Sequence, residues 1–297
     1  MTIALLTTVK AILQHPLSSL DRQAAIVRYL KWQIGSRLVP GPVVVPFIGS
    51  ASLIVSPGMT GATQNLYTGL SDFSDCACLL HLLREGDLFV DIGANVGVYT
   101  VLASGVVGAS SIAIEPVPST FRRLCANLQV NNIASRVVAH NIGLSREAGT
   151  LTFTSNQDCM NRIAPENWSG PTIAVPVATL DEVLNGRRPT LIKIDVEGWE
   201  SQVFAGAKAT LESSSLLALI VEMDSSTATM NENEEAVDRT LRHHGFAPSS
   251  YDPFTRSLTQ LPGKNRKSGN TLYLRNLPQV AALLSTAPSF AVNGRSF

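Results

Sequence analysis

Leu88-Phe-Val-Asp-Ile-Gly-Ala-Asn-Val-Gly-Val-Tyr-Thr100 is an apolar run that passes into a glycine turn and then into a helical pattern. The run predicts a buried strand, and Gly93 and Gly97 predict a tight turn before the helix. We expect that side chains at these two positions would collide with a ligand lying against the turn. In an open α/β sheet, the first such turn is where a nucleotide-like ligand binds. The stretch therefore predicts an α/β domain with a ligand at the carboxyl edge of its sheet.

Further apolar runs alternate with helical segments along the chain. The runs that predict the parallel strands lie at 88–92, 111–114, 137–142, 191–194 and 217–223. Two later runs, 247–251 and 271–275, predict a closing antiparallel hairpin. The seven runs predict a mainly parallel sheet with helices on both faces. Alternating polar and apolar residues at 149–177 instead predict an antiparallel insertion at the mouth of the sheet.

The segments on either side of this domain have a different pattern. Residues 1–85 predict an N-terminal cap that contains an amphipathic helix at 21–38, two short strands and a second helix. The main domain is expected to span residues 86–275. Residues 276–297 are expected to form an irregular C-terminal tail.

Composition narrows the function classes. Lys plus Arg and Asp plus Glu number 23 each, so the balanced charge offers no broad footprint for nucleic acid. Charged residues make up 15% of the chain against a typical share of roughly 25%, which allows a homo-oligomer or loose membrane contact. No apolar run is long enough to predict a transmembrane segment. The opening residues lack a basic start and a cleavage site, so a cytoplasmic protein is expected.

The residues around the glycine turn favour one cofactor over another. Glu115 ends the next strand, where an acidic residue commonly accepts hydrogen bonds from two ribose hydroxyls. Asp91 adds negative charge beside the turn, which suits an ammonium and a sulfonium group better than phosphates. A dinucleotide-binding turn would need glycines at 93, 95 and 98, but Asn95 and Val98 stand there. The pattern therefore favours S-adenosylmethionine and disfavours an NAD-dependent oxidoreductase.

A second motif, Leu191-Ile-Lys-Ile-Asp-Val-Glu-Gly-Trp-Glu200, delivers two carboxylates to the same edge of the sheet. Asp195 or Glu197 could act as a general base, orient an acceptor or bind the methionine amine. Alternatively, Asp195 caps a helix that begins near Gly198. Two carboxylates also suit Mg²⁺, but no third ligand is identifiable, so no metal is predicted.

Several other polar residues are weaker candidates for ligand contact. Asn141 and its neighbour His140 close the third strand, where they could contact the adenine or the acceptor, or form a packed hydrogen-bonded pair. Glu222 ends the fifth strand and is a candidate for acceptor contact. Asp158 and Asn161, in the insertion, are candidates of the same kind.

The motifs resemble those of the FkbM family of methyltransferases. The resemblance rests on Phe89–Thr100, on Ile114-Glu-Pro116 and on Ile192–Glu200, and it covers roughly residues 65–275. It implies a class I methyltransferase fold, which is Rossmann-like, and S-adenosylmethionine as cofactor. It also implies O-methylation of a small-molecule natural product or a glycan.

The resemblance also assigns roles to single residues. The family's cofactor-binding turn matches Asp91, Gly93, Asn95 and Gly97, and its ribose-binding acid matches Glu115. Its Asp-x-Glu-Gly motif matches Asp195, Glu197 and Gly198, which implies catalytic carboxylates, and Trp199 replaces the usual Tyr. The alternatives are a non-catalytic binding module that keeps the fold and, with less support, the oxidoreductase.

Overall fold

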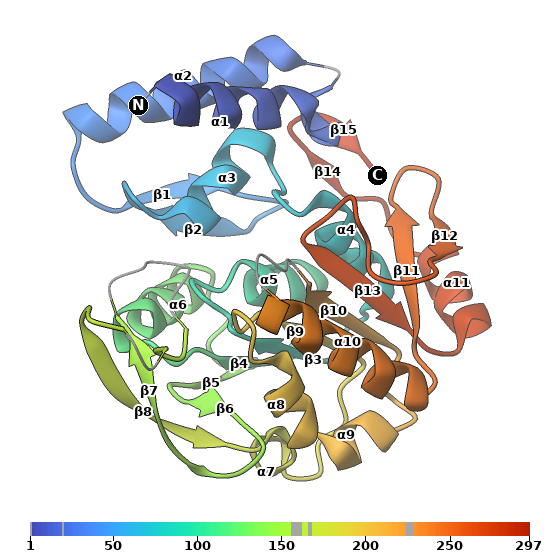
Figure 1. Ribbon diagram of the computed structural model, residues 1–297. Coiled ribbons are helices and arrows are strands. Elements are labelled where there is room, and N and C mark those ends of the chain that lie inside the picture. The colour runs from blue at the N-terminus through green and yellow to red at the C-terminus, as the bar shows by residue number, and fades with distance from the viewer. Residues whose placement is uncertain (1, 20, 156–161, 166–167, 224–227) are drawn as a thin grey trace.

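The computed structural model describes residues 2–19, 21–155, 162–165, 168–223 and 228–297. A large twisted sheet carries helices on both faces, and a smaller N-terminal cap lies across one end of it (Figure 1). In the described part of the chain, the helices are all too short or too polar to cross a membrane.

The main sheet has eight strands in the order β12-β11-β13-β10-β9-β3-β4-β5. Five central strands run parallel, whereas β13, β11 and β12 pair antiparallel. Their bounds are β3 Leu88–Ile92, β4 Ser110–Ile114, β5 Val137–His140, β9 Leu191–Ile194, β10 Ala218–Glu222, β11 Ala247–Asp252, β12 Ser257–Gln260 and β13 Asn270–Leu274. The mainly parallel sheet predicted from sequence is confirmed, and β12 is an added strand at its antiparallel edge.

Helices cover both faces because the central strands are apolar on both sides. Phe89 of β3 packs toward α4 and α11, whereas Val90 and Ile92 pack toward α8, α9 and α10. The helix bounds are α4 Phe73–Leu82, α5 Val98–Val101, α6 Pro118–Val130, α7 Leu180–Leu184, α8 Glu200–Ala205, α9 Lys208–Glu212, α10 Ala228–His243 and α11 Leu277–Ser285, with a π-helical turn at Leu102–Val107. Residues of α4 therefore belong to the core of the main sheet.

The cap is joined to the main domain by hydrogen bonds of two asparagines, Asn127 and Asn131, which we call the asparagine ladder. It comprises α1 Thr2–Gln14, a 3-10 turn at Pro16–Ser18, α2 Arg22–Leu38, the hairpin of β1 Val43–Pro46 with β2 Ser52–Val55, and α3 Thr60–Thr68. Asn131, which directly follows α6, exchanges two hydrogen bonds of 2.8 Å with the backbone of Ser52. Asn127 accepts from the Ile54 N–H at 2.7 Å and donates to the Val96 carbonyl at 2.8 Å. These asparagine side chains thus satisfy the backbone of β2.

The insertion forms its own three-stranded sheet in the order β6-β8-β7. Its strands are β6 Gly143–Leu144, β7 Gly149–Thr154 and β8 Thr172–Ala178. Strand β7 pairs antiparallel with residues 172–177 of β8, as expected for residues 149–177. Phe153, Val175 and Val177 form a small apolar cluster within the insertion.

Residues 276–297 correct one expectation, because they do not form an irregular tail. They form α11 and a hairpin of β14 Ala291–Val292 with β15 Arg295–Ser296. Val280 and Leu284 of α11 are fully buried against α4, because they lie one turn apart on the same helix face. The ring of Phe297 lies 5.1 Å from that of Phe73. These contacts give the segment enough apolar burial to be ordered.

Candidate active site

The turn between β3 and α5 needs glycine because protein atoms, and not only a ligand, crowd it. Gly93 and Gly97 have φ values of +72° and +86°. A Cβ on Gly93 would overlap the carbonyl oxygen of Asp195, and one on Gly97 would overlap the Leu124 side chain of α6. We expected a ligand to exclude side chains here, whereas the neighbouring strand and helix already do so. Gly93 thus allows the glycine turn to pack directly against the Asp195 motif, and Gly97 allows it to pack against α6.

Glu115 lies at the end of β4 and braces the glycine turn. Its Oε2 accepts from the Asn95 N–H at 3.0 Å, and its Oε1 accepts from the Val117 N–H at 2.9 Å. The residue is only 6% exposed, and this burial raises the pKa of its carboxyl to about 7. Each oxygen retains a lone pair that can accept a further hydrogen bond.

Asp91 and Asn141 lie behind the turn. Asp91 Oδ2 accepts from the backbone N–H and the hydroxyl of Thr100, at 3.1 and 2.6 Å, and so fixes the start of the helix. The Asn141 amide donates to the carbonyl oxygens of Glu115 and Pro116, at 2.8 and 3.0 Å. Both residues were expected to touch the cofactor, but within the described part of the chain neither lines a cavity at the turn. They hold the loops that do.

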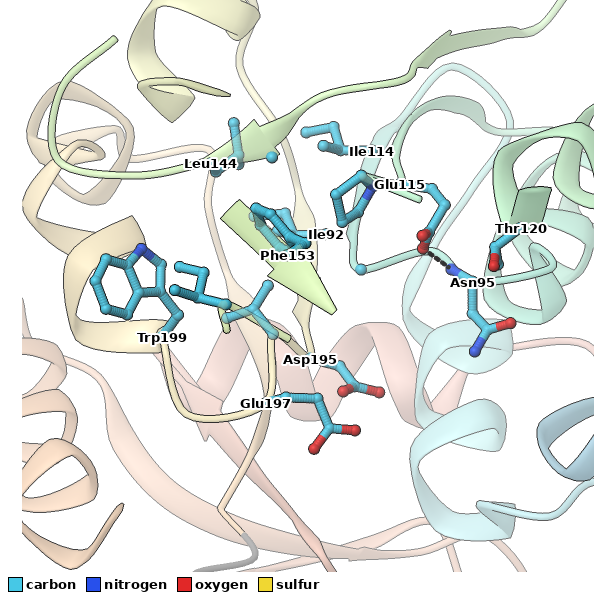
Figure 2. A pocket seen from close by; sticks show the side chains of 15 residues that line it. Ile92, Asn95, Ile114, Glu115, Thr120, Leu144, Phe153, Asp195, Glu197 and Trp199 are labelled. Atoms are coloured by element: carbon cyan, nitrogen blue, oxygen red, sulfur yellow. Dashed lines mark hydrogen bonds between the residues drawn. The ribbon is translucent and has the colours of Figure 1, made fainter. Parts of the chain in front are cut away.

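A first cavity lies on the β4 side of the turn (Figure 2). Its polar lining includes Glu115, Asn95 and Thr120. Its apolar walls come from strand ends, from the insertion and from the start of α8: Ile92, Ile114, Leu144, Phe153, Ile163 and Trp199. Apolar walls with a few fixed polar groups suit a flat heterocycle joined to a ribose.

A second cavity of about 500 Å³ lies on the other side of the turn. The cap contributes Gly61, Gln64 and Asn65 from α3, with Ser71 and Asp72 following. The opposite wall carries mostly charged residues from the ends of β9 and β10, from the start of α8 and from α10: Lys193, Asp195, Glu197, Glu200, Glu222 and Glu234. The two cavities share four lining residues, namely Gly93, Asn95, Asp195 and Glu197.

Three carboxylates meet where the cavities join. Asp195, Glu197 and Glu222 each place an oxygen within 4.8 Å of the other two. Lys193 is buried in β9 and its Nζ lies 2.9 Å from Asp195 Oδ2. Glu222 therefore joins the two carboxylates that the motif provided, and together they offer the oxygen ligands that a divalent cation prefers. The sequence motif alone does not show that Glu222 lies beside Asp195 and Glu197, because Glu222 comes from a different strand.

The proximity of these groups changes their proton affinity. Burial, and then the charge of Asp195, raise the pKa of Glu197 to about 7. The same two causes, with Glu197 in addition, raise the pKa of Glu222 to about 10. Burial acts to lower the pKa of Lys193, but Asp195 and Asp91 outweigh it and raise that pKa above its ordinary value. At neutral pH the cluster thus contains a neutral Glu222, a charged Lys193 and a Glu197 near its midpoint.

The alternative role of Asp195 as a helix cap is wrong. Helix α8 begins at Glu200 after Trp199, and no side chain caps it. Glu200 instead holds the preceding turn, because its Oε1 accepts from the N–H groups of Val196 and Gly198. Its Oε2 accepts from the Asn233 amide at 2.7 Å. Asp195 and Glu197 are therefore left facing the cavities.

Comparison with known proteins places these motifs in a family. A family model described as the methyltransferase FkbM domain matches residues 91–248, which is more than half of the chain. The chain belongs to the FkbM methyltransferase family. Membership implies S-adenosylmethionine as the methyl donor, in agreement with the cofactor expected from the glycine turn.

Named relatives are distant. Hexuronic acid methyltransferase AglP of Haloferax volcanii is 29% identical over 137 residues, which are 46% of this chain and 56% of that protein. The chain thus spans just over half the length of AglP. The 31-O-demethyl-FK506 methyltransferase FkbM of Streptomyces tacrolimicus is 28% identical over 223 residues, 63% of this chain and 82% of that protein. A solved precorrin-6y C5,15-methyltransferase from Geobacter metallireducens aligns over 67% of this chain and 86% of its own, at 14% identity and a TM-score of 0.39.

The site of this FkbM-family chain fits the donor. Trp199 lines the first cavity, and its Nε1 is a buried polar atom without a hydrogen-bond partner among the described residues. Glu115 keeps free lone pairs at the first cavity, and the shared wall beside it is acidic. An aromatic base, a ribose and a cationic methionine end would each meet groups of matching chemistry.

Sequence reasoning missed part of the site. Lys193 could have been recognised, because a lysine inside an apolar strand run is rarely buried without a charge partner. The contributions of Gln64 and Asn65 had no signal in sequence, because they depend on where the cap docks. Asp158 and Asn161 lie outside the described residues.

Proposed function

We propose that the chain is an S-adenosylmethionine-dependent methyltransferase that methylates a hydroxyl where the two cavities meet. The observation that carries the proposal is the shared wall of Gly93, Asn95, Asp195 and Glu197 between the first cavity and the larger second one. A donor whose adenosine occupies the first cavity would point its methionine end across this wall. An acceptor in the second cavity would then face the methyl group in line.

Some of the expected cofactor-binding residues would contact the donor, and others would support the loops that do. Glu115 would accept hydrogen bonds from the ribose hydroxyls, and Asn95, Gly93 and Gly97 would form the turn against the methionine end. Asp91 and Asn141 would act through the loops that they hold. The bound donor supplies a methyl group on a sulfonium, which makes displacement at carbon possible without a metal or a redox step.

The chain's own residues would position the acceptor and remove its proton. A carboxylate with a pKa of about 7 can accept a proton at neutral pH, which favours Glu197 as the base. Asp195, paired with Lys193, would orient the acceptor or the methionine amine. Glu197 would take the hydroxyl proton of the acceptor, and the donor would supply the methyl group, with its carbon–sulfur bond broken and S-adenosylhomocysteine as the leaving group.

The acceptor class is supported by the cavity and by the relatives. The second cavity offers the Gln64 amide and the Ser71 hydroxyl, which can hydrogen-bond a hydroxyl-rich molecule. Its carboxylates would repel a polyanion such as nucleic acid. The names of AglP and FkbM refer to a hexuronic acid and to a demethylated natural product. We therefore propose a small-molecule or glycan acceptor.

Titration calorimetry of the full chain with S-adenosylmethionine tests the proposal. We expect saturable binding, no binding of NADH, and a dissociation constant about tenfold or more higher for Glu115→Ala, because charge-assisted hydrogen bonds are lost. Glu212→Ala, an exposed carboxylate on α9, is the matched control and should bind as the wild type. Absence of saturable heat at millimolar donor would overturn the proposal. Thermal unfolding of each variant verifies that it is folded.

A further inference from the structure

An apolar stripe on α2 faces outward from the cap. Val27, Leu30, Ile34 and Leu38 are 46%, 49%, 59% and 76% exposed. Their spacing of three or four residues puts them on one face of the helix. Single exposed apolar residues are ordinary, but a continuous stripe of four marks a contact surface.

The other face of α2 already has its partners. Ala25 and Tyr29 are buried, and the Tyr29 ring packs against that of Tyr67 of α3, with 5.1 Å between ring centroids. Arg28 Nε donates to the Tyr67 carbonyl at 3.0 Å. Figure 1 shows α1 and α2 at the outer end of the molecule, away from the main sheet. The stripe is therefore not needed to hold the cap together.

Basic residues accompany the stripe. Residues 2–70 contain a single carboxylate, Asp21, and five basic side chains: Lys10, Arg22, Arg28, Lys31 and Arg37. Lys31 and Arg37 are exposed and lie on either side of the stripe in the helical repeat. Because the whole chain has no net charge, the rest of it is net negative. The molecule thus has a positive end that carries the apolar stripe.

This charge pattern distinguishes between two partners that could cover the stripe, a second copy of the chain and an anionic membrane. A second copy would bring Lys31 and Arg37 of both chains together, and α2 contains no carboxylate to pair with them. An anionic bilayer surface matches both features, because its headgroups attract the basic side chains and its acyl boundary accepts the apolar ones. We propose that α2 docks the protein peripherally on an anionic membrane surface through this stripe.

The helix proposed to dock, α2, belongs to the cap, and the cap also forms one wall of the second cavity. Helix α3 lies between them: Tyr67 contacts α2, whereas Gly61 and Gln64 line the cavity. A docked protein would hold this wall, and the cavity behind it, close to the membrane. The inference does not depend on methyl transfer, since it rests only on the cap.

Vesicle co-sedimentation of the full chain tests the docking. We expect the protein to sediment with vesicles of phosphatidylcholine and phosphatidylglycerol, to stay in solution with phosphatidylcholine alone, and to be released by added salt. Leu30→Glu with Ile34→Glu should lower the partition at least about tenfold, because apolar burial is lost. Lys31→Gln or Arg37→Gln should each lower it about fivefold. The matched control Val130→Glu, an exposed apolar residue of α6, should leave it unchanged.

Two outcomes would overturn the proposal. One is equal sedimentation with both vesicle types, or with neither. The other is a wild-type dimer that Leu30→Glu with Ile34→Glu converts to a monomer, which would assign the stripe to a second copy. Unchanged S-adenosylmethionine binding by the α2 variants verifies that their main domain is intact and separates this test from that of the catalytic function.

Discussion

Glu197 occupies an unusual position for a carboxylate. Its backbone has a φ of +54°, a conformation that residues other than Gly and Asn seldom adopt. This conformation directs residue 197 away from the path of the β9 strand, to the junction of the two cavities, where Asp195 and Glu222 crowd it. Strain of this kind persists where the surroundings enforce it, and it often accompanies function.

The pH dependence of turnover follows from the pKa of Glu197. A base is active only when ionised, and the pKa is raised to about 7, so the rate should rise with pH through about 7 and level off above it. Glu197→Gln should lower kcat about 100-fold and abolish this dependence, because the amide cannot accept the proton. The measurement is transfer of tritium-labelled methyl from S-adenosylmethionine to a hydroxyl acceptor.

The variant Asp195→Asn distinguishes the role of Asp195 from that of Glu197. It should also slow turnover while the donor still binds, but it should keep the rise of rate with pH that Glu197 causes. Calorimetry with S-adenosylmethionine supplies the binding constants. If both variants lose only donor affinity, the assignment of a base to this pair is wrong.

Single residues show both the reach and the limits of sequence reasoning. The position of Glu115 beside the turn follows from strand order, which one sequence can reveal. A Cβ on Gly93 would overlap Asp195, which lies about a hundred positions later in the chain, so no local sequence pattern could predict this contact. For the same reason, sequence alone could not decide whether Asp195 caps the following helix, because the answer depends on Glu200, which holds the preceding turn.

At the scale of elements, the cap depends on two asparagines at the C-terminal end of α6, Asn127 within the helix and Asn131 directly after it. Asn127 is fully buried and joins Ile54 of β2 to Val96 of the glycine turn. One side chain thus connects the cap hairpin to the cofactor loop. Backbone groups that lost these bonds would stay buried without partners, which is costly.

Removal of this connection should loosen the cap more than the sheet. Asn127→Ala should lower the free energy of unfolding by about 2 kcal/mol, because it leaves the Ile54 N–H and the Val96 carbonyl without partners. Urea unfolding measures the loss, and limited proteolysis should show earlier cleavage between α2 and β1. The exposed neighbour Gln129, changed to Ala, is the control. Equal stability of the two variants would show that the ladder does not hold the cap.

Elements were predictable where a periodic pattern was long. The parallel strands follow from apolar runs, the insertion hairpin from alternation of polar and apolar residues, and α2 from the helical repeat of its apolar residues. The segment after residue 276 was misjudged because its order comes from partners: Val280 and Leu284 contact α4, and Phe297 contacts Phe73. A short amphipathic helix shows its role only when the surface that it covers is known.

At the scale of the whole molecule, different parts of the chain build the two cavities. The main domain and its insertion enclose the first, whereas the cap provides one wall of the second. Helix periodicity predicted that a cap exists, but its place followed from the ladder on α6. This division implies that donor and acceptor binding can be changed independently.

A pair of variants tests that independence. Gln64→Trp on α3 should fill the second cavity and raise the KM for the acceptor, while the dissociation constant of S-adenosylmethionine stays within about twofold of the wild type. Phe153→Ala in the insertion should weaken donor binding about tenfold, because an aromatic contact to the adenine is lost. Calorimetry with the donor and steady-state kinetics with the acceptor measure the two effects. Donor binding lost in Gln64→Trp, or unchanged in Phe153→Ala, would mean that the cavities are not divided between donor and acceptor as proposed.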